Sequence, residues 1–150
     1  MEHAAGPALL IALEGSGLAQ ALRSSLWLYP AVETLHILGF ATLVGSILAF
    51  DLRVLRAPDD FAVEPWLRWL VPIAACGLLL AMPMGLLLFT AEATAYVRNP
   101  VFLAKITLIL LGLLNIAWFY AGPWRVRRRV GASAGIPPAM RMSAALSMVA

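Results

Sequence analysis

Two ionisable side chains, Glu33 and His36, lie in the apolar segment VETLHILGFATLVGSILAF at residues 32–50. A spacing of three residues places both on one face of a helix. An imidazole can bind a metal through one ring nitrogen or exchange a proton near neutral pH. An unpaired charge at the centre of a bilayer costs at least about 2.5 kcal/mol. We therefore expect these two side chains to have polar partners or a bound group.

Other polar and sulfur-containing side chains are expected at a similar depth. Lys105 lies near the start of a later apolar segment that runs in the same direction as the segment of Glu33, so the two can form a pair. Met82 and Met84 come near the end of an antiparallel segment, at the level of His36. The sequence thus predicts a single polar layer beneath the outer membrane surface.

Each residue of this layer also has a purely structural interpretation. Glu33 can be an interfacial acid hydrated by water, and Lys105 can extend its amine to the surface. His36 can be a neutral core histidine that is hydrogen-bonded to Glu33 or to a backbone carbonyl. Met82 and Met84 can be packing residues, since an M-x-M pair directs its sulfurs to different faces of a helix. The functional alternatives for His36 are axial ligation of haem, a copper site with the thioethers and a proton relay.

The elements that would position these residues are membrane helices. The 150 residues are 62% apolar and 13% charged, with a mean hydropathy of +0.87, whereas a soluble domain needs a more polar surface. Residues 27–52, 66–89 and 100–120 form apolar stretches long enough to cross a bilayer. Asn99 fits the N-cap of the third stretch, and Pro100 fits its first helical position.

Shorter segments complete the predicted fold. Within residues 1–26, PALLIAL and GLAQALRSSLWL are predicted to lie at the interface. GPWRVRRRVGASAGIPP is predicted to be a basic loop. Residues 139–150 would open a fourth helix that covers roughly 18 Å of a core about 30 Å thick, and we expect this helix to be truncated. The prediction is an all-α transmembrane bundle over residues 27–150, with three full spans and a partial fourth.

The arginines predict the orientation. They are concentrated in the first and third loops and just after them, at Arg53, Arg56, Arg68, Arg125, Arg127, Arg128, Arg129 and Arg141. The opposite side has only Arg23 and Arg98 near the surface. The positive-inside rule then places the N-terminus outside and the arginine-rich loops in the cytoplasm.

Several functional classes are disfavoured by composition. The net charge of +3 is no signal for nucleic acid, because the basic residues flank apolar runs. A single cysteine, Cys76, excludes an intrachain disulfide and a cysteine-rich metal site, and we expect it to be a small buried hydrophobe. The sequence has no nucleotide-binding loop, no nucleophile with a partnered base and no carboxylate pair suited to hydrolysis.

Two segments resemble a bacterial family of small four-helix membrane proteins of unknown function. LYPAVETLHILGFATLVGSILAFDLRVLR is similar to the family's first helix, with its pattern on Glu33, His36, Gly39, Gly45, Asp51 and Arg53. NPVFLAKITLILLGLLN is similar to the third helix, with its pattern on Asn99, Pro100, Phe102, Lys105, Gly112 and Asn115. The resemblance covers about residues 27–130. It implies a fourth span and a location in the bacterial cytoplasmic (inner) membrane.

A more distant resemblance concerns the cofactor. The L-H-x-x-G pattern resembles copper-resistance D-type membrane proteins and bacterial haem-binding protoporphyrinogen oxidases, in which a first-helix histidine ligates haem b. It implies that His36 is an axial ligand. On the haem hypothesis we expect the sixth position to be open or filled by Met82 or Met84. Lys105 and Arg98 would pair with the haem propionates.

The third helix departs from this pattern. Family members often carry a histidine a few residues after the asparagine, where this chain has Tyr120. Because His3 and His36 are the only histidines, a haem held by two histidines is not expected.

Three functions follow from these patterns. We expect a haem b or redox protein of the membrane, working with a membrane redox partner or as a homo-oligomer. The second is a structural or assembly subunit of a membrane complex, whose polar residues fix helix register. The third is a copper-handling or small-solute transport protein that uses His36 with the methionines, or a proton relay.

Overall fold

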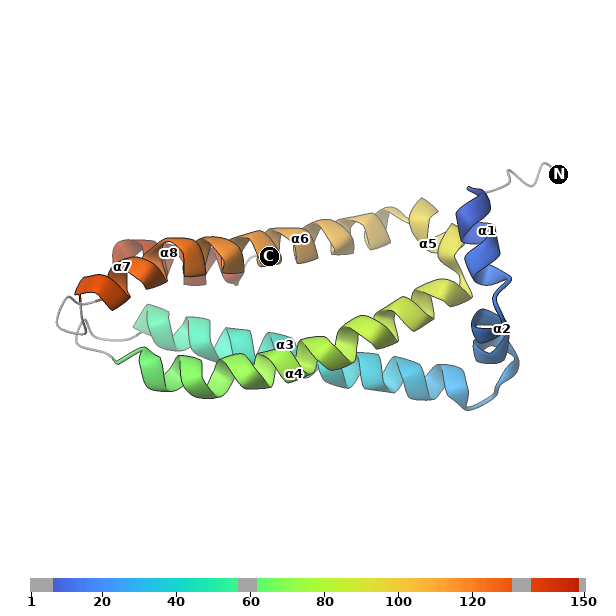
Figure 1. Cartoon of the computed structure of the whole chain (residues 1–150), viewed down its shortest axis with the longest axis horizontal. Coiled ribbons are helices and arrows are strands. Elements are labelled where there is room, and N and C mark those ends of the chain that lie inside the picture. The colour runs from blue at the N-terminus through green and yellow to red at the C-terminus, as the bar shows by residue number, and fades with distance from the viewer. Residues whose placement is uncertain (1–6, 57–61, 131–135, 149–150) are drawn as a thin grey trace. The chain divides into compact units, whose positions relative to one another are not determined.

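The computed structural model describes residues 7–56, 62–130 and 136–148, without the side chains of 127–130. The described residues form helices and short connections, with no strand among them (Figure 1). In chain order the helices are α1 (Ala8–Glu14), α2 (Gly17–Ser24), α3 (Leu28–Arg56), α4 (Glu64–Ala91), α5 (Ala93–Arg98), α6 (Pro100–Ala121), α7 (Pro123–Val130) and α8 (Pro138–Ser147). This confirms the all-α prediction.

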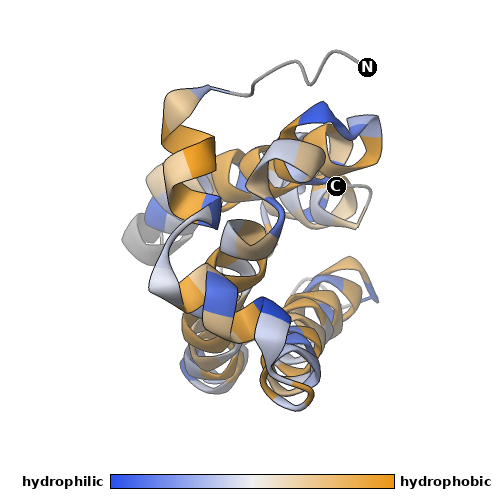
Figure 2. Ribbon diagram, turned by 90° about the vertical axis from the view of Figure 1, so that its right-hand side faces the viewer, coloured by the Kyte–Doolittle hydropathy of each residue, from blue (hydrophilic) through white to orange (hydrophobic). Residues whose placement is uncertain are grey.

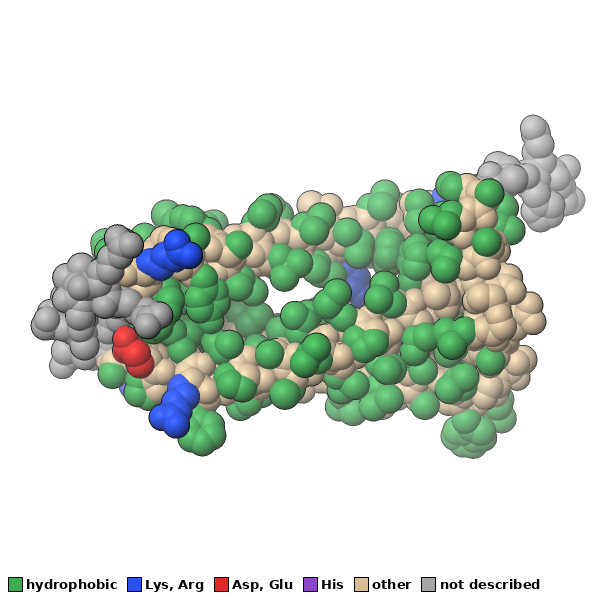
Figure 3. All heavy atoms as spheres, viewed as in Figure 1, with side chains coloured by type: hydrophobic (Ala, Val, Ile, Leu, Met, Phe, Trp, Pro, Cys, Tyr) green, Lys and Arg blue, Asp and Glu red, His purple; other side chains and the backbone are tan. Residues whose placement is uncertain are grey.

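Three helices are long and apolar enough to cross a membrane: α3, α4, and α6 with its continuation to Val126. In the most apolar 18-residue stretch of each of these spans, at most 17% of the residues are buried. Apolar residues predominate along these helices (Figure 2), and hydrophobic side chains are distributed along them on the face shown in Figure 3. Such surfaces are stable against acyl chains and unfavourable in water. The chain is thus a multi-pass membrane protein.

The contacts divide the chain into two compact units. The first contains residues 1–41 and 76–104, and the second contains residues 42–75 and 105–150. The long helices α3, α4 and α6 each contribute to both units.

Within the first unit, α3 and α4 approach each other closely at glycine. A Cβ atom added to Gly39 would lie 2.7 Å from the backbone nitrogen of Ala81 and 2.9 Å from the carbonyl oxygen of Gly77. Gly77, Ala81 and Gly85 recur at every fourth position of α4 and so form a stripe of small residues on one face. Small residues on both helices let the two backbones come into contact, as membrane helices commonly do.

The two N-terminal helices are tied to α4 and α5 of the same unit. Arg23 donates to the carbonyl oxygen of Ala91 at 2.7 Å and to that of Glu14 at 2.6 Å. The Glu14 carboxylate accepts from the backbone N–H and the hydroxyl of Thr94, both at 2.7 Å. Ser16 accepts from Ala19 and so caps α2. The predicted interfacial segment is therefore two short helices fixed by hydrogen bonds.

The second unit has its own core, to which α8 contributes. The buried residues of this core are Val54, Val63, Phe119, Ile136, Met140 and Ala144. Asn115 on α6 donates to the Ser143 carbonyl at 2.9 Å and accepts from the Ser143 hydroxyl at 3.0 Å. Arg141 donates to the Leu55 carbonyl at 3.2 Å. Polar and apolar contacts together fix α8 in this unit.

Local sequence signals at the helix ends gave mixed results. Asn99 caps α6 as predicted, since its side-chain oxygen accepts from the N–H of Val101 at 2.9 Å, and Pro100 is the first residue of the helix. The segment predicted to be a basic loop instead begins with the helix α7. Pro123 suits a first helical position, and arginine has a high helix propensity. Residues 131–135 lie outside the described residues.

The course of α4 and the exposure of its cysteine bear on two expectations. A kink or loosening of the helix is predicted at Pro72 and Pro83. The helix α4 is uninterrupted from Glu64 to Ala91 and contains both prolines, and the predicted kink stays a prediction. Cys76 is exposed rather than buried. It precedes the buried Gly77, and neighbouring residues of a helix point about 100° apart, so it lies on an outward-facing side of α4.

Candidate functional site

His36 is held by a backbone carbonyl of the neighbouring helix. Its Nδ1 lies 2.8 Å from the carbonyl oxygen of Ala81. A carbonyl oxygen only accepts hydrogen bonds, so Nδ1 carries the hydrogen and donates it. In the neutral ring Nε2 then carries the lone pair, and it has no hydrogen-bond partner among the residues that the structure describes. Of the two structural partners expected for His36, the carbonyl is observed.

A glycine of α4 makes room for the imidazole ring. A Cβ atom added to Gly85 would lie 2.8 Å from Cε1 and 3.1 Å from Nδ1 of His36. The ring is half-buried and lies about 12 Å along α3 from Leu28. The α3–α4 packing thus fixes the orientation of the ring while its Nε2 lone pair is unengaged.

Glu33 lies one turn before His36 on α3 and is exposed. Its carboxylate is within electrostatic reach of the Tyr29 hydroxyl, which is hydrogen-bonded to Tyr96 on α5. Tyr96 also packs against Phe102, with ring centroids 5.2 Å apart. Polar and aromatic contacts therefore join the start of α3 to α5 and the start of α6 within the first unit.

The two methionines of α4 differ in exposure, as an M-x-M pair on a helix should. Met82 is 58% exposed, whereas Met84 is half-buried. Arg98 is exposed in the last turn of α5. These three residues belong to the same unit as His36.

Lys105 and Tyr120 belong to the second unit, where both are exposed on α6. Tyr120 packs edge-on against Phe119, with ring centroids 5.4 Å apart. The pairing of Glu33 with Lys105, and the polar layer that it would complete, stay predictions.

Among the described residues, Asp51 has a buried side-chain oxygen whose hydrogen-bonding capacity is not satisfied. It is 5% exposed in the second unit and is hydrogen-bonded to Ser147 on α8. Its Oδ2 is buried and has no hydrogen-bond partner in the part of the chain that the structure describes. A buried carboxylate oxygen without a donor is costly. The D-x-R pattern contained Asp51, but nothing in it indicated the contact with Ser147.

The described residues contain no group of three or more His, Cys, Asp or Glu side chains that could hold a metal ion. Axial ligation of haem does not require such a group, because a single suitable imidazole is enough. The residues that sequence reasoning missed are the small residues of α4 that face Gly39 and His36. Their spacing of four, Gly77, Ala81 and Gly85, was a visible signal. Arg23 gave no comparable signal, because both of its partners are backbone carbonyls.

No family model, curated protein or solved structure matches this chain. The resemblance of its first and third spans to a bacterial membrane family stays a prediction. Its function has to be inferred from the geometry of its own residues.

Proposed function

We propose that the chain is a haem b protein of the membrane in which His36 is an axial ligand. The observation that carries this proposal is the bond from Nδ1–H to the Ala81 carbonyl, with Nε2 unengaged. Metal-ligating histidines commonly donate their other ring N–H to a backbone carbonyl or carboxylate, which fixes the tautomer and the direction of the ring. His36 meets that requirement before any cofactor binds.

The other residues of the first unit fit this role in part. Met84, half-buried on α4, suits the sixth position better than Met82, which is 58% exposed; otherwise that position is open. Arg98 is the cation of this unit nearest in sequence to the third span and would pair with a propionate. Haem would supply one-electron transfer, while the chain's residues hold it and exclude water.

The proposed location is the bacterial cytoplasmic membrane, with the N-terminus outside. The distribution of arginines supports this orientation. The helical form of the basic segment α7 adds to it, because a basic amphipathic helix suits the anionic cytoplasmic leaflet. A redox role then requires a membrane redox partner or a second copy of the chain.

The test is the visible absorption spectrum of the full chain, purified in detergent from haem-replete cells. His36→Asn is the informative variant, because the asparagine amide nitrogen replaces Nδ1 as a donor while nothing replaces Nε2. We expect a Soret band in the wild type and in His3→Asn, which changes the only other histidine. We expect its loss in His36→Asn with helicity retained. A colourless wild type, or an unchanged band in His36→Asn, contradicts the proposal, and metal analysis of the same material tests for copper.

The same observation favours a second candidate, a structural or assembly subunit. The His36–Ala81 bond and the close packing around Gly39 fix α3 on α4 whether or not a cofactor binds. In this case the purified protein is colourless, and His36→Asn retains the structural role in the complex. It would also co-purify with a larger membrane complex.

A further inference from the structure

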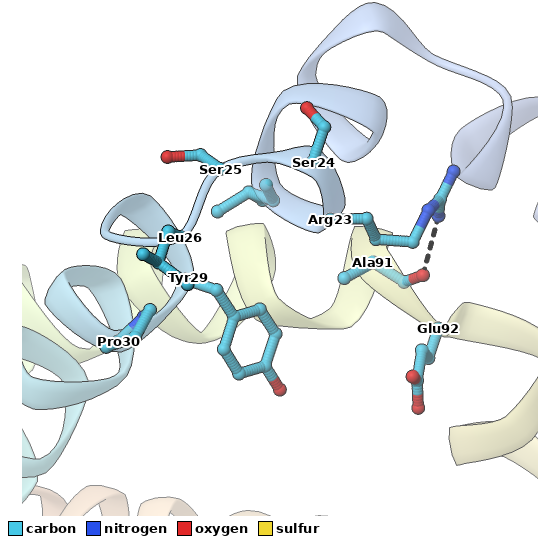
Figure 4. Close-up of a pocket in the computed structure, with 9 residues that line it drawn as sticks. Arg23, Ser24, Ser25, Leu26, Tyr29, Pro30, Ala91 and Glu92 are labelled. Carbon is cyan, nitrogen blue, oxygen red and sulfur yellow. Dashed lines mark hydrogen bonds between the residues drawn. The ribbon is translucent and has the colours of Figure 1, made fainter.

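A pocket of about 580 Å³ lies in the first unit, where α2, the start of α3 and the end of α4 meet (Figure 4). Its volume is in the range of small-ligand sites. The lining residues are Leu22, Arg23, Ser24, Ser25, Leu26, Tyr29, Pro30, Ala91 and Glu92. The pocket contains none of the residues assigned to the haem site.

The lining contains one cation and one anion. The Arg23 guanidinium is held in place by the carbonyls of Ala91 and Glu14. These bonds use two of its five N–H groups and leave donors for an anionic group. Glu92 stands at the N-cap of α5 without a side-chain capping bond, and it is exposed. The pocket therefore offers an immobilised donor for an anion and a carboxylate for a cation.

The position of the pocket along the spans corresponds to the lipid headgroups. The span α3 starts at Leu28 and the span α4 ends at Ala91, so the pocket lies where both helices leave the hydrocarbon core. Leu26 is 81% exposed and Trp27 is 79% exposed in the adjoining connection. Exposed tryptophan beside the end of a span is typical of the membrane–water interface.

We propose that this pocket binds the headgroup of phosphatidylethanolamine. The phosphate accepts hydrogen bonds from Arg23, the primary ammonium donates to Glu92, and the acyl chains lie along the apolar surfaces of α3 and α4. A glycerol headgroup has no cation for Glu92. A choline headgroup is a cation but has no N–H to donate. Phosphatidylethanolamine complements both charged groups of the lining.

The experiment measures which lipid the full chain retains. The protein is reconstituted into an equimolar mixture of phosphatidylethanolamine, phosphatidylcholine and phosphatidylglycerol, extracted, and analysed by native mass spectrometry. Wild type should retain phosphatidylethanolamine over phosphatidylcholine by about two- to fivefold, as expected of one exposed charge pair. Glu92→Gln should abolish this preference. Glu64→Gln, which changes an exposed acid at the other end of α4, should leave it intact.

Two further arms separate the alternatives. Arg23→Lys keeps the positive charge but has fewer N–H donors than arginine, so retention of all three lipids, each of which carries a phosphate, should fall. Glu92→Gln should change only the choice between headgroups. Soluble glycerophosphoethanolamine should displace the lipid, and inorganic phosphate should not. Equal retention of the two zwitterionic lipids by the wild type, or a preference that survives Glu92→Gln, overturns the proposal. Displacement by inorganic phosphate alone would show a free-anion site instead.

Discussion

Replacing Gly39 by alanine tests the packing that holds His36. The added Cβ atom would lie 2.7 Å from the Ala81 nitrogen and 2.9 Å from the Gly77 oxygen. Both are backbone atoms, so no side chain can rotate away. Restoring ordinary contact requires α3 and α4 to separate locally by about 0.7 Å, which weakens the packing over the whole crossing. The same shift would lengthen the bond between His36 and Ala81, which is 2.8 Å long.

The expected cost follows from two opposing effects. Overpacking a well-fitted contact costs about 1–3 kcal/mol, while removing a glycine from a helix gains about 0.5–1 kcal/mol. Gly39→Ala should therefore destabilise the protein by about 1–2 kcal/mol. Gly45→Ala is the matched control on the same helix, because no atom of the described residues lies within 4 Å of its added Cβ atom. It should be neutral or stabilising by up to about 1 kcal/mol.

The assay is reversible unfolding in mixed micelles, followed by helical circular dichroism. Gly112→Ala on α6, whose added Cβ atom also has no neighbour within 4 Å among the described residues, provides a second control. If Gly39→Ala proves as stable as Gly45→Ala, the close approach of α3 and α4 is refuted. The orientation deduced for the His36 ring would be refuted with it.

Three further perturbations test other contacts. Hydrogen bonds from the Thr94 backbone N–H and then from its hydroxyl hold the pKa of Glu14 below its ordinary value of 4.5. This stabilisation is present above pH 4.5 and lost as pH falls through the folded-state pKa. The melting temperature of the wild type should therefore fall at acidic pH, and Glu14→Gln should flatten that decrease. Parallel plots of melting temperature against pH for the two proteins would argue against the contact. Asn115→Ala removes both bonds to Ser143 and should destabilise the protein by about 1–3 kcal/mol. Ser143→Ala should cost less, because it keeps the backbone carbonyl that accepts from Asn115. Equal and additive costs in a double-mutant cycle would contradict the pairing. Asp51→Asn should leave thermal stability unchanged or higher, because it removes a buried carboxylate whose Oδ2 has no donor among the described residues. A loss above about 2 kcal/mol would mean that Oδ2 does have a partner.

The spans were predictable because their signals are local. About 20 apolar residues in a row specify a membrane helix whatever their neighbours are. The cap of α6 was equally readable, since Asn99 and Pro100 act on the backbone next to them. The helix α7 was missed because its arginines drew attention to topology, although their helix propensity favoured the observed structure.

The partner of His36 was not predictable from side-chain types. Its acceptor is a backbone carbonyl, 45 residues away in sequence, and every residue has such a group. A backbone carbonyl was expected as one kind of partner, beside Glu33, but side-chain types could not indicate which carbonyl it would be. The stripe of Gly77, Ala81 and Gly85 was the better signal, because small residues at a spacing of four mark the face where another backbone approaches.

The most direct test of the central claim is a titration of haemin into the purified, haem-free full chain, followed at the Soret maximum. If Nε2 of His36 is the ligand, the wild type should saturate in stoichiometric proportion to the chain. The His36→Asn variant, folded to the same helicity, should give only the unsaturable signal of haemin in micelles. Identical titration curves for the two proteins would contradict the account.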